Sequence, residues 1–422
     1  MGYIFTLLVV LFPVLGQVGL PIQVPFITAN VSLGMLLLIP FVVVYLCDKW
    51  PVKGLFAIRP VRLGGTVGFA FALLLLSVIG ASSSGGGYAG LKTAVIALVF
   101  LPLLILTARG NFRVSYGMSA YVFFSVCFSL YLVLQVVLLA KGYGYLSDGF
   151  FSDSYIFAGA ELSRFVDTGF AASFFLSGDA FALYVLPALV YLLLWDRSGY
   201  RFFPFAAGII LSAAIALSGS AVGIILMLLV WAVYVILPTV YFLLHPADAV
   251  YRFTHGGAPR IISLILTFMI CTTMITLYLI DGTASKVLAP VFEEILGGEA
   301  LIGAFSAVSR VLVTRSQLLC GVGFGNVDAA FGAIGESAPA LSLVGEILLS
   351  CGVLGLAALA LLLVGLMLRS RGKFGYTLAL MLILLSSFTS VGLLPTFVFW
   401  FFISHAVGKI EMPFKRYMRV EY

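Results

Sequence analysis

Residues 343–368 read LVGEILLSCGVLGLAALALLLVGLML, a run whose only charged side chain is Glu346. A helix needs about 20 predominantly apolar residues to cross the hydrocarbon core of a bilayer. This run is longer than that and is followed by Arg369, so we expect a membrane-spanning helix here. An ionisable group inside such a span is costly to keep, and Glu346 is therefore a functional candidate.

The rest of the chain has the same apolar character. Hydrophobic residues make up 62% of the 422 residues and charged residues only 9%, whereas soluble domains carry about 25% charged residues. The composition predicts an integral membrane protein with membrane lipids around it. The net charge of +6 comes from basic residues scattered through short loops, as membrane topology requires, and does not indicate a nucleic-acid partner.

Hydropathy divides the chain into about twelve apolar segments, which we interpret as membrane spans. We therefore expect an all-α polytopic membrane protein that forms one integral membrane domain over residues 1–422. The predicted spans are 3–20, 32–48, 63–82, 92–108, 117–140, 174–195, 202–218, 220–244, 261–280, 343–368, 375–393 and 395–408.

The basic residues fix the expected orientation of these spans. Seventeen of the 23 Lys and Arg fall on one side of the twelve-span arrangement, which the positive-inside rule assigns to the cytoplasm. Both termini are then cytoplasmic. The six basic residues on the outer side are exceptions to this bias and are candidates for a site: Lys92, Lys141, Arg164, Lys286, Arg310 and Arg315.

Two long segments lie on the outer side of this arrangement, over residues of about 141–173 and 281–342. Within the second, residues 290–308 mix apolar and acidic side chains in the manner of one or two short amphipathic helices at the membrane surface. No His or Asp/Glu cluster with metal-ligand spacing occurs in either segment, so we hypothesise chemistry that is independent of metal.

The stretch of residues 309–326, SRVLVTRSQLLCGVGFGN, precedes the span that contains Glu346. Its two arginines, Arg310 and Arg315, are followed by glycines at alternate positions, Gly321, Gly323 and Gly325. This spacing is not the dinucleotide fingerprint G-x-G-x-x-G, and no strand and helix frame it. One interpretation is a simple tight turn, because glycine tolerates positive φ angles.

An arginine-bearing segment, a G-x-G-x-G turn and a span with a G-x-x-G-L signature, here CGVLGL at residues 351–356, follow one another in this chain. This order resembles the O-antigen polymerase and ligase superfamily. Upstream, Arg164 precedes a Gly- and Phe-rich stretch and a span that contains Pro187. The motif at the start of that span is often Glu-Pro-Ser in the polymerases, whereas this chain has Ser-Gly-Asp at residues 177–179.

The sequence LSGSAVG at residues 217–223 joins two predicted spans. Members of the superfamily often carry a Ser-x-Ser turn at this point, and Ser218 and Ser220 match it. The alternative interpretation is close helix packing, because Gly219 and Gly223 form a G-x-x-x-G spacing. The resemblance as a whole covers roughly residues 164–356.

The resemblance implies a GT-C-like helical enzyme at the periplasmic face of a bacterial inner membrane. It implies transfer of glycans carried on undecaprenyl diphosphate, with no cofactor and no metal. The polymerase branch (Wzy-type) joins lipid-linked oligosaccharide repeat units into O-antigen or a related surface polysaccharide. A chain-length regulator protein is a further expected partner of such a polymerase.

Glycosyl transfer from a lipid diphosphate requires stabilisation of the leaving diphosphate and removal of a proton from the attacking hydroxyl. Arginine suits the first task because its guanidinium forms paired hydrogen bonds with phosphate oxygens. Arg164, Arg310 and Arg315 are the outer arginines, and we expect them to bind the diphosphate. On a straight helix the last two would diverge by about 140°, so they could converge only across a bend, or one of them is structural.

The candidate bases are Asp179 and Glu346, each at the outer start of an apolar span. Wet surroundings or a structural ion pair with an arginine is the alternative interpretation of Glu346. The expected substrate-lining residues come from the glycine stretch and the Ser-x-Ser turn. They are Gly321, Gly323, Gly325, Asn326, Ser218 and Ser220.

Two other functions compete with the polymerase. An O-antigen ligase, which transfers glycan to lipid A core, typically has a histidine before the G-x-x-G-L span, and residues 339–342 contain none. A twelve-helix secondary transporter is the alternative from another class. The loop CDKWPVKGLFAIRPVRLGG at residues 47–65 lacks the G-x-x-x-D-R-x-G-R pattern of the major facilitators.

Overall fold

The computed structural model describes residues 2–15, 33–49, 65–83, 104, 107, 112–140, 171–175, 178–195, 202–244, 310–336, 342–369 and 381–382. Every regular element in these ranges is a helix and none is a strand, which confirms the all-α class for this part of the chain. The elements are α1 (Gly2–Leu15), α2 (Leu33–Lys49), α4 (Gly65–Ser83), α6 (Val114–Ala140), α9 (Gly178–Val190), the π-helical turn η1 (Tyr191–Trp195), α10 (Phe202–Leu217), α11 (Ala221–Leu244), α16 (Arg315–Cys320), α17 (Val327–Ala333) and α18 (Leu343–Arg369).

Two of these helices are long and apolar enough to cross a membrane, Ser115–Leu138 within α6 and Leu343–Gly365 within α18. The other apolar helical stretches in the described ranges are 10–17 residues long, such as Gly68–Ser82 within α4 and Ala221–Tyr234 within α11. The predicted spans 261–280 and 395–408 lie outside the described residues, as do most of 92–108 and 375–393. Of the two predicted outer segments, the structure describes residues 171–173 of the first and residues 310–336 and 342 of the second.

The sixth predicted span begins later than its hydropathy suggests. Residues 171–175 form a turn, and α9 begins only at Gly178. Ser173 has a φ of +57°, a value that a helix does not allow. Its backbone is held by Gln135 of α6, whose side chain accepts from the Ser173 N–H at 3.1 Å and donates to the Ser173 carbonyl at 3.3 Å.

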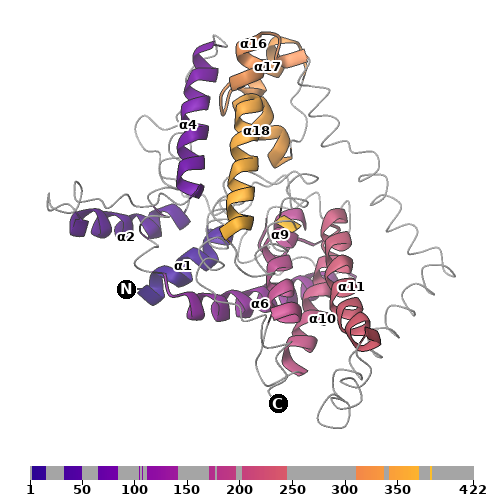
Figure 1. Cartoon of the computed structure of the whole chain (residues 1–422). Coiled ribbons are helices and arrows are strands. Elements are labelled where there is room, and N and C mark those ends of the chain that lie inside the picture. The colour runs from indigo at the N-terminus through magenta and orange to yellow at the C-terminus, as the bar shows by residue number, and fades with distance from the viewer. Residues whose placement is uncertain are drawn as a thin grey trace.

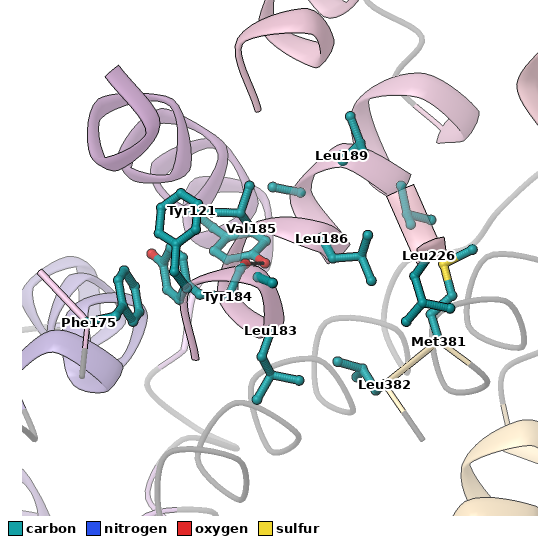
Figure 2. Close-up of a cluster of buried hydrophobic side chains, with 14 of the residues drawn as sticks. Tyr121, Phe175, Leu183, Tyr184, Val185, Leu186, Leu189, Leu226, Met381 and Leu382 are labelled. Carbon is teal, nitrogen blue, oxygen red and sulfur yellow. Dashed lines mark hydrogen bonds between the residues drawn. The ribbon is translucent and has the colours of Figure 1, made fainter. Parts of the chain in front are cut away.

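The helices α6, α9, α10 and α11 pack into one group, and α1 lies against α6 (Figure 1). Two tyrosines lie at its centre, with the rings of Tyr121 and Tyr184 5.2 Å apart (Figure 2). The Tyr121 hydroxyl donates to the Tyr184 carbonyl, and the Tyr184 hydroxyl donates to the Val10 carbonyl at 3.3 Å. Buried tyrosines need such partners because an unpaired hydroxyl is costly inside a protein.

A second group is formed by α4 and α18, which run side by side, with α16 and α17 at their shared end (Figure 1). The C-terminal part of α4, around Ser77 and Gly80, lies against the segment that links α16 to α17. The N-terminal part of α18 lies against the same segment. This junction holds most of the residues that the sequence singles out.

Candidate functional site

A bend separates the two arginines of the 309–326 stretch. Arg310 belongs to the short piece before the bend, and α16 begins only at Arg315. Thr314 caps α16: its hydroxyl accepts from the Gln317 N–H at 3.2 Å, and the Gln317 side chain accepts from the Thr314 N–H at 3.1 Å. This reciprocal pair starts a new helix at this position. The angle that a straight helix would impose on the two arginines therefore does not apply.

The glycine turn, residues 321–325, needs glycine for two reasons. Gly321, Gly323 and Gly325 have φ angles of +74°, +89° and +76°, which side chains rarely permit. The first two are also buried by neighbouring backbone. A Cβ at Gly321 would lie 2.3 Å from the Ser350 carbonyl carbon, and one at Gly323 would lie 2.9 Å from the Ser77 carbonyl oxygen.

The helix α18 is broken at Gly352, where φ is +67° and ψ is −165°. In an unbroken helix the carbonyls of Leu349 and Ser350 would accept from residues 353 and 354. They accept instead from the glycine turn, from the N–H groups of Val322 and Gly323, each at 2.9 Å. The break therefore leaves neither of these two carbonyls without a hydrogen-bond donor.

A third amide of the turn reaches α4. The Phe324 N–H donates to the hydroxyl of Ser77 at 2.9 Å, and both residues are buried. Two carbonyls of the turn are satisfied by Asn326, which donates its side-chain amide to the Val322 carbonyl at 3.1 Å. The Asn326 N–H donates to the Gly323 carbonyl at 3.2 Å. Asn326 is buried by this arrangement and closes the turn.

The ionisable residues around the turn differ in their partners. Arg310 forms a salt bridge with Glu336, its Nη1 lying 2.7 and 2.9 Å from the two carboxylate oxygens. Arg315 is exposed and has no ion pair among the described residues. Glu346 lies half-buried in the first turn of α18, and no described residue donates to its carboxylate. Within the part of the chain that the structure describes, neither Arg315 nor Glu346 has a partner of opposite charge.

The second cluster of sequence-predicted residues lies at the contact between the start of α9 and the turn that joins α10 to α11. The Ser220 hydroxyl donates to Asp179 Oδ1 at 2.6 Å and accepts from the Gly223 N–H at 3.1 Å. The Ser218 hydroxyl donates to the Ile215 carbonyl at 2.8 Å. Both serines are buried. Their hydroxyls form hydrogen bonds within the protein, Ser218 to the end of α10 and Ser220 to Asp179 of α9, and so have a structural role at this junction.

Two glycines allow the backbones to approach at the same place. A Cβ at Gly178 would lie 2.0 Å from the Ser218 carbonyl oxygen, and one at Gly223 would lie 2.7 Å from the Ala182 Cβ. Gly219 adopts a φ of +68° in the turn between α10 and α11. Close helix packing, the alternative interpretation of the G-x-x-x-G spacing, is therefore what Gly223 provides, whereas Gly219 makes the turn.

The structure joins the glycine turn to the helix of Glu346, and it joins Asp179 to Ser220. Arg164 lies outside the described residues. Among the described residues no three His, Cys, Asp or Glu side chains gather in a way that could hold a metal ion.

The sequence did not point to Ser77 and Gly80 of α4, which the structure places against the glycine turn. Only the glycine at position 80 could have signalled the close contact, since a Cβ there would lie 2.8 Å from the Cys320 carbonyl oxygen.

Comparisons of the chain with models of protein families, with curated proteins and with solved structures find no match. The resemblance to the O-antigen polymerase and ligase superfamily therefore rests on the order of the motifs in residues 164–356.

Proposed function

We propose that this protein is a metal-independent polymerase of lipid-linked glycan repeat units, with Arg315 and Glu346 at its reacting centre. The observation that carries the proposal is the hydrogen-bonded contact between the glycine turn and the break in α18. The helix α16, which begins at Arg315, leads into the glycine turn. Two backbone hydrogen bonds of 2.9 Å join this turn to the part of α18 that carries Glu346. A guanidinium and a carboxylate, neither paired with another described residue, are thus supplied by two elements that are fixed to each other.

The chemistry assigned to the pair is a single displacement at a sugar carbon. The hydroxyl of an acceptor repeat unit attacks the anomeric carbon of the donor, and the bond from that carbon to the diphosphate oxygen breaks. The hydroxyl proton passes to the Glu346 carboxylate, which acts as general base. The departing diphosphate carries the bonding electron pair, and the Arg315 guanidinium stabilises its negative charge.

The other charged groups take secondary places in this proposal. Arg310 is paired with Glu336, so we assign it to holding the 310–336 segment together and not to the diphosphate. Asp179 accepts a hydrogen bond from Ser220 and is the second candidate for the base. Arg164 keeps its expected role as a diphosphate ligand on the strength of the sequence resemblance.

We further propose a twelve-span, GT-C-like arrangement with both termini in the cytoplasm, and two contacts agree with the alternation of sides that it requires. In that arrangement the C-terminal end of α4 and the N-terminal end of α18 both face the periplasm, and these are the ends that meet at the glycine turn. Gln135 near the end of α6 and Ser173 before α9 would also share the outer side, and they are hydrogen bonded. Large apolar side chains of α18 are exposed, with Leu361 at 74% and Leu368 at 80%, as for a helix that faces lipid.

The experiment is reconstitution of the full chain in liposomes with a defined undecaprenyl-diphosphate-linked repeat unit. The polymerase produces a ladder of regularly spaced products on a gel from this one substrate. A ligase leaves the repeat unit unextended until lipid A core is added, and a transporter only moves it across the bilayer. Either of those outcomes would reject the proposed function.

A further inference from the structure

We propose that Ser77 of α4 is a positioning residue for the transfer reaction. Its hydroxyl accepts from the Phe324 N–H at 2.9 Å, and it is fully buried. The sequence resemblance begins only near residue 164, so nothing in the motifs points to α4. This inference rests on the proposed function of Arg315 and Glu346 and adds a third helix to the machinery that places them.

Three consecutive amides of the turn, those of Val322, Gly323 and Phe324, bind to other helices. We call this set the three-amide contact. The first two amides donate to carbonyls of α18 and the third donates to Ser77, all at 2.9 Å. The turn is therefore fixed between α4 and α18 by hydrogen bonds that run in one continuous stretch of backbone. Such buried bonds are costly to leave unmade.

The three-amide contact determines where both reacting groups lie. The helix α16, which begins at Arg315, ends at Cys320 and passes directly into the turn. The short part of α18 that carries Glu346 ends at the break, and two of its last carbonyls are held by the turn. A shift of the turn would move the guanidinium and the carboxylate relative to each other.

Ser77 is the part of this contact that can be altered with least disturbance. The amides of Val322 and Gly323 and the carbonyls of α18 are backbone atoms, which a substitution cannot remove. Ser77→Ala deletes a single oxygen and leaves the Phe324 N–H without its acceptor. The helix α4 also meets the break in α18 at another point, because Cys351 Sγ lies 3.6 Å from the Leu73 carbonyl oxygen, so α4 should stay packed in the variant.

The test compares Ser77→Ala with Ser82→Ala in the reconstituted full chain. Ser82 lies in the same helix and is exposed, and its hydroxyl donates to the Ile79 carbonyl of its own turn at 2.7 Å. Small misplacements of catalytic groups cost on the order of 10²-fold in rate. We expect Ser77→Ala to lower kcat about 10- to 100-fold with little change in KM, and Ser82→Ala to match the wild type.

A double-mutant cycle with Glu346→Gln separates positioning from a loss of folded protein. If Ser77 acts by placing Glu346 relative to Arg315, Ser77→Ala should lower the residual rate of Glu346→Gln by a clearly smaller factor than it lowers the wild-type rate, because coupled residues are not additive. A merely structural role would lower both backgrounds by the same factor. Equal factors, or a wild-type kcat for Ser77→Ala, would overturn the inference.

Hydrogen exchange provides a readout that does not depend on activity. Peptides covering residues 320–326 should exchange faster in Ser77→Ala than in Ser82→Ala, because one amide of the three-amide contact has lost its acceptor. Unchanged exchange would also overturn the inference. A wild-type protein that makes no ladder, with faster exchange in Ser77→Ala, would instead reject the proposed function and leave the contact itself intact.

Discussion

Replacing Gly352 by alanine should destabilise the protein strongly, because the break in α18 requires glycine twice over. The backbone angles at Gly352, φ +67° and ψ −165°, lie in a region that is essentially restricted to glycine and costs about 1–3 kcal/mol for other residues. The new Cβ would also lie 2.3 Å from the Leu319 carbonyl oxygen and 2.6 Å from the Cys320 amide nitrogen. Relieving such a contact inside a packed core costs typically about 1–3 kcal/mol more.

The expected loss for Gly352→Ala is therefore about 2–6 kcal/mol. Gly365→Ala is the matched control, since Gly365 lies in the same helix and a Cβ added there would have no described atom within 4 Å. That change should be neutral or stabilise the helix by up to about 1 kcal/mol.

The assay is reversible unfolding of the purified full chain in mixed micelles, by titration with sodium dodecyl sulfate and circular dichroism at the helical band. Gly352→Ala should unfold at a clearly lower detergent fraction than the wild type, and Gly365→Ala should not. Equal unfolding midpoints for the two variants would refute the conclusion that the break in α18 and its contact with the glycine turn are structural requirements.

The remaining predictions concern charge, packing and orientation. Arg315→Lys should lower the polymerisation rate about 10²–10³-fold at normal protein level, because lysine keeps the charge but loses the paired hydrogen bonds, whereas Arg310→Lys should stay within a few-fold in the ladder assay. Gly178→Ala should lower the unfolding midpoint, since its Cβ would lie 2.0 Å from the Ser218 carbonyl oxygen; an unchanged midpoint would show that α9 can move away from the turn. With the five native cysteines replaced, a cysteine at Ala333 should react with an impermeant reagent from outside and one at Ser370 should not, and the reverse pattern would invert the proposed orientation.

The sequence predicts much of the helical architecture in the described ranges because hydropathy is a strong signal for long apolar helices. The predicted spans 117–140 and 343–368 match α6 (Val114–Ala140) and α18 (Leu343–Arg369) to within a few residues. The late start of α9 was not predictable, since it depends on Gln135, which is distant in sequence and holds the backbone of Ser173.

The sequence predicted the turn formed by the alternating glycines of the candidate site, but not the contacts of that turn with α4 and α18. Alternating glycines indicate a turn with positive φ angles, and Gly321, Gly323 and Gly325 have them. The break at Gly352 could not be inferred, because Gly352 lies within an uninterrupted apolar run and the carbonyls before the break accept hydrogen bonds from amides of another segment. Ser77 gave no signal either, since a serine in an apolar span forms its contact only in the folded chain.

The most direct test of the account is the balance of products in single-turnover transfer by the reconstituted protein, with a chelator present. We predict that each new glycosidic bond releases one undecaprenyl diphosphate, that chelator leaves the rate unchanged, and that Glu346→Gln lowers the rate with little effect on binding of the lipid-linked substrate. Diphosphate release without chain extension, or a Glu346→Gln variant as fast as the wild type, would contradict the assignment of Arg315 and Glu346 to one glycosyl transfer.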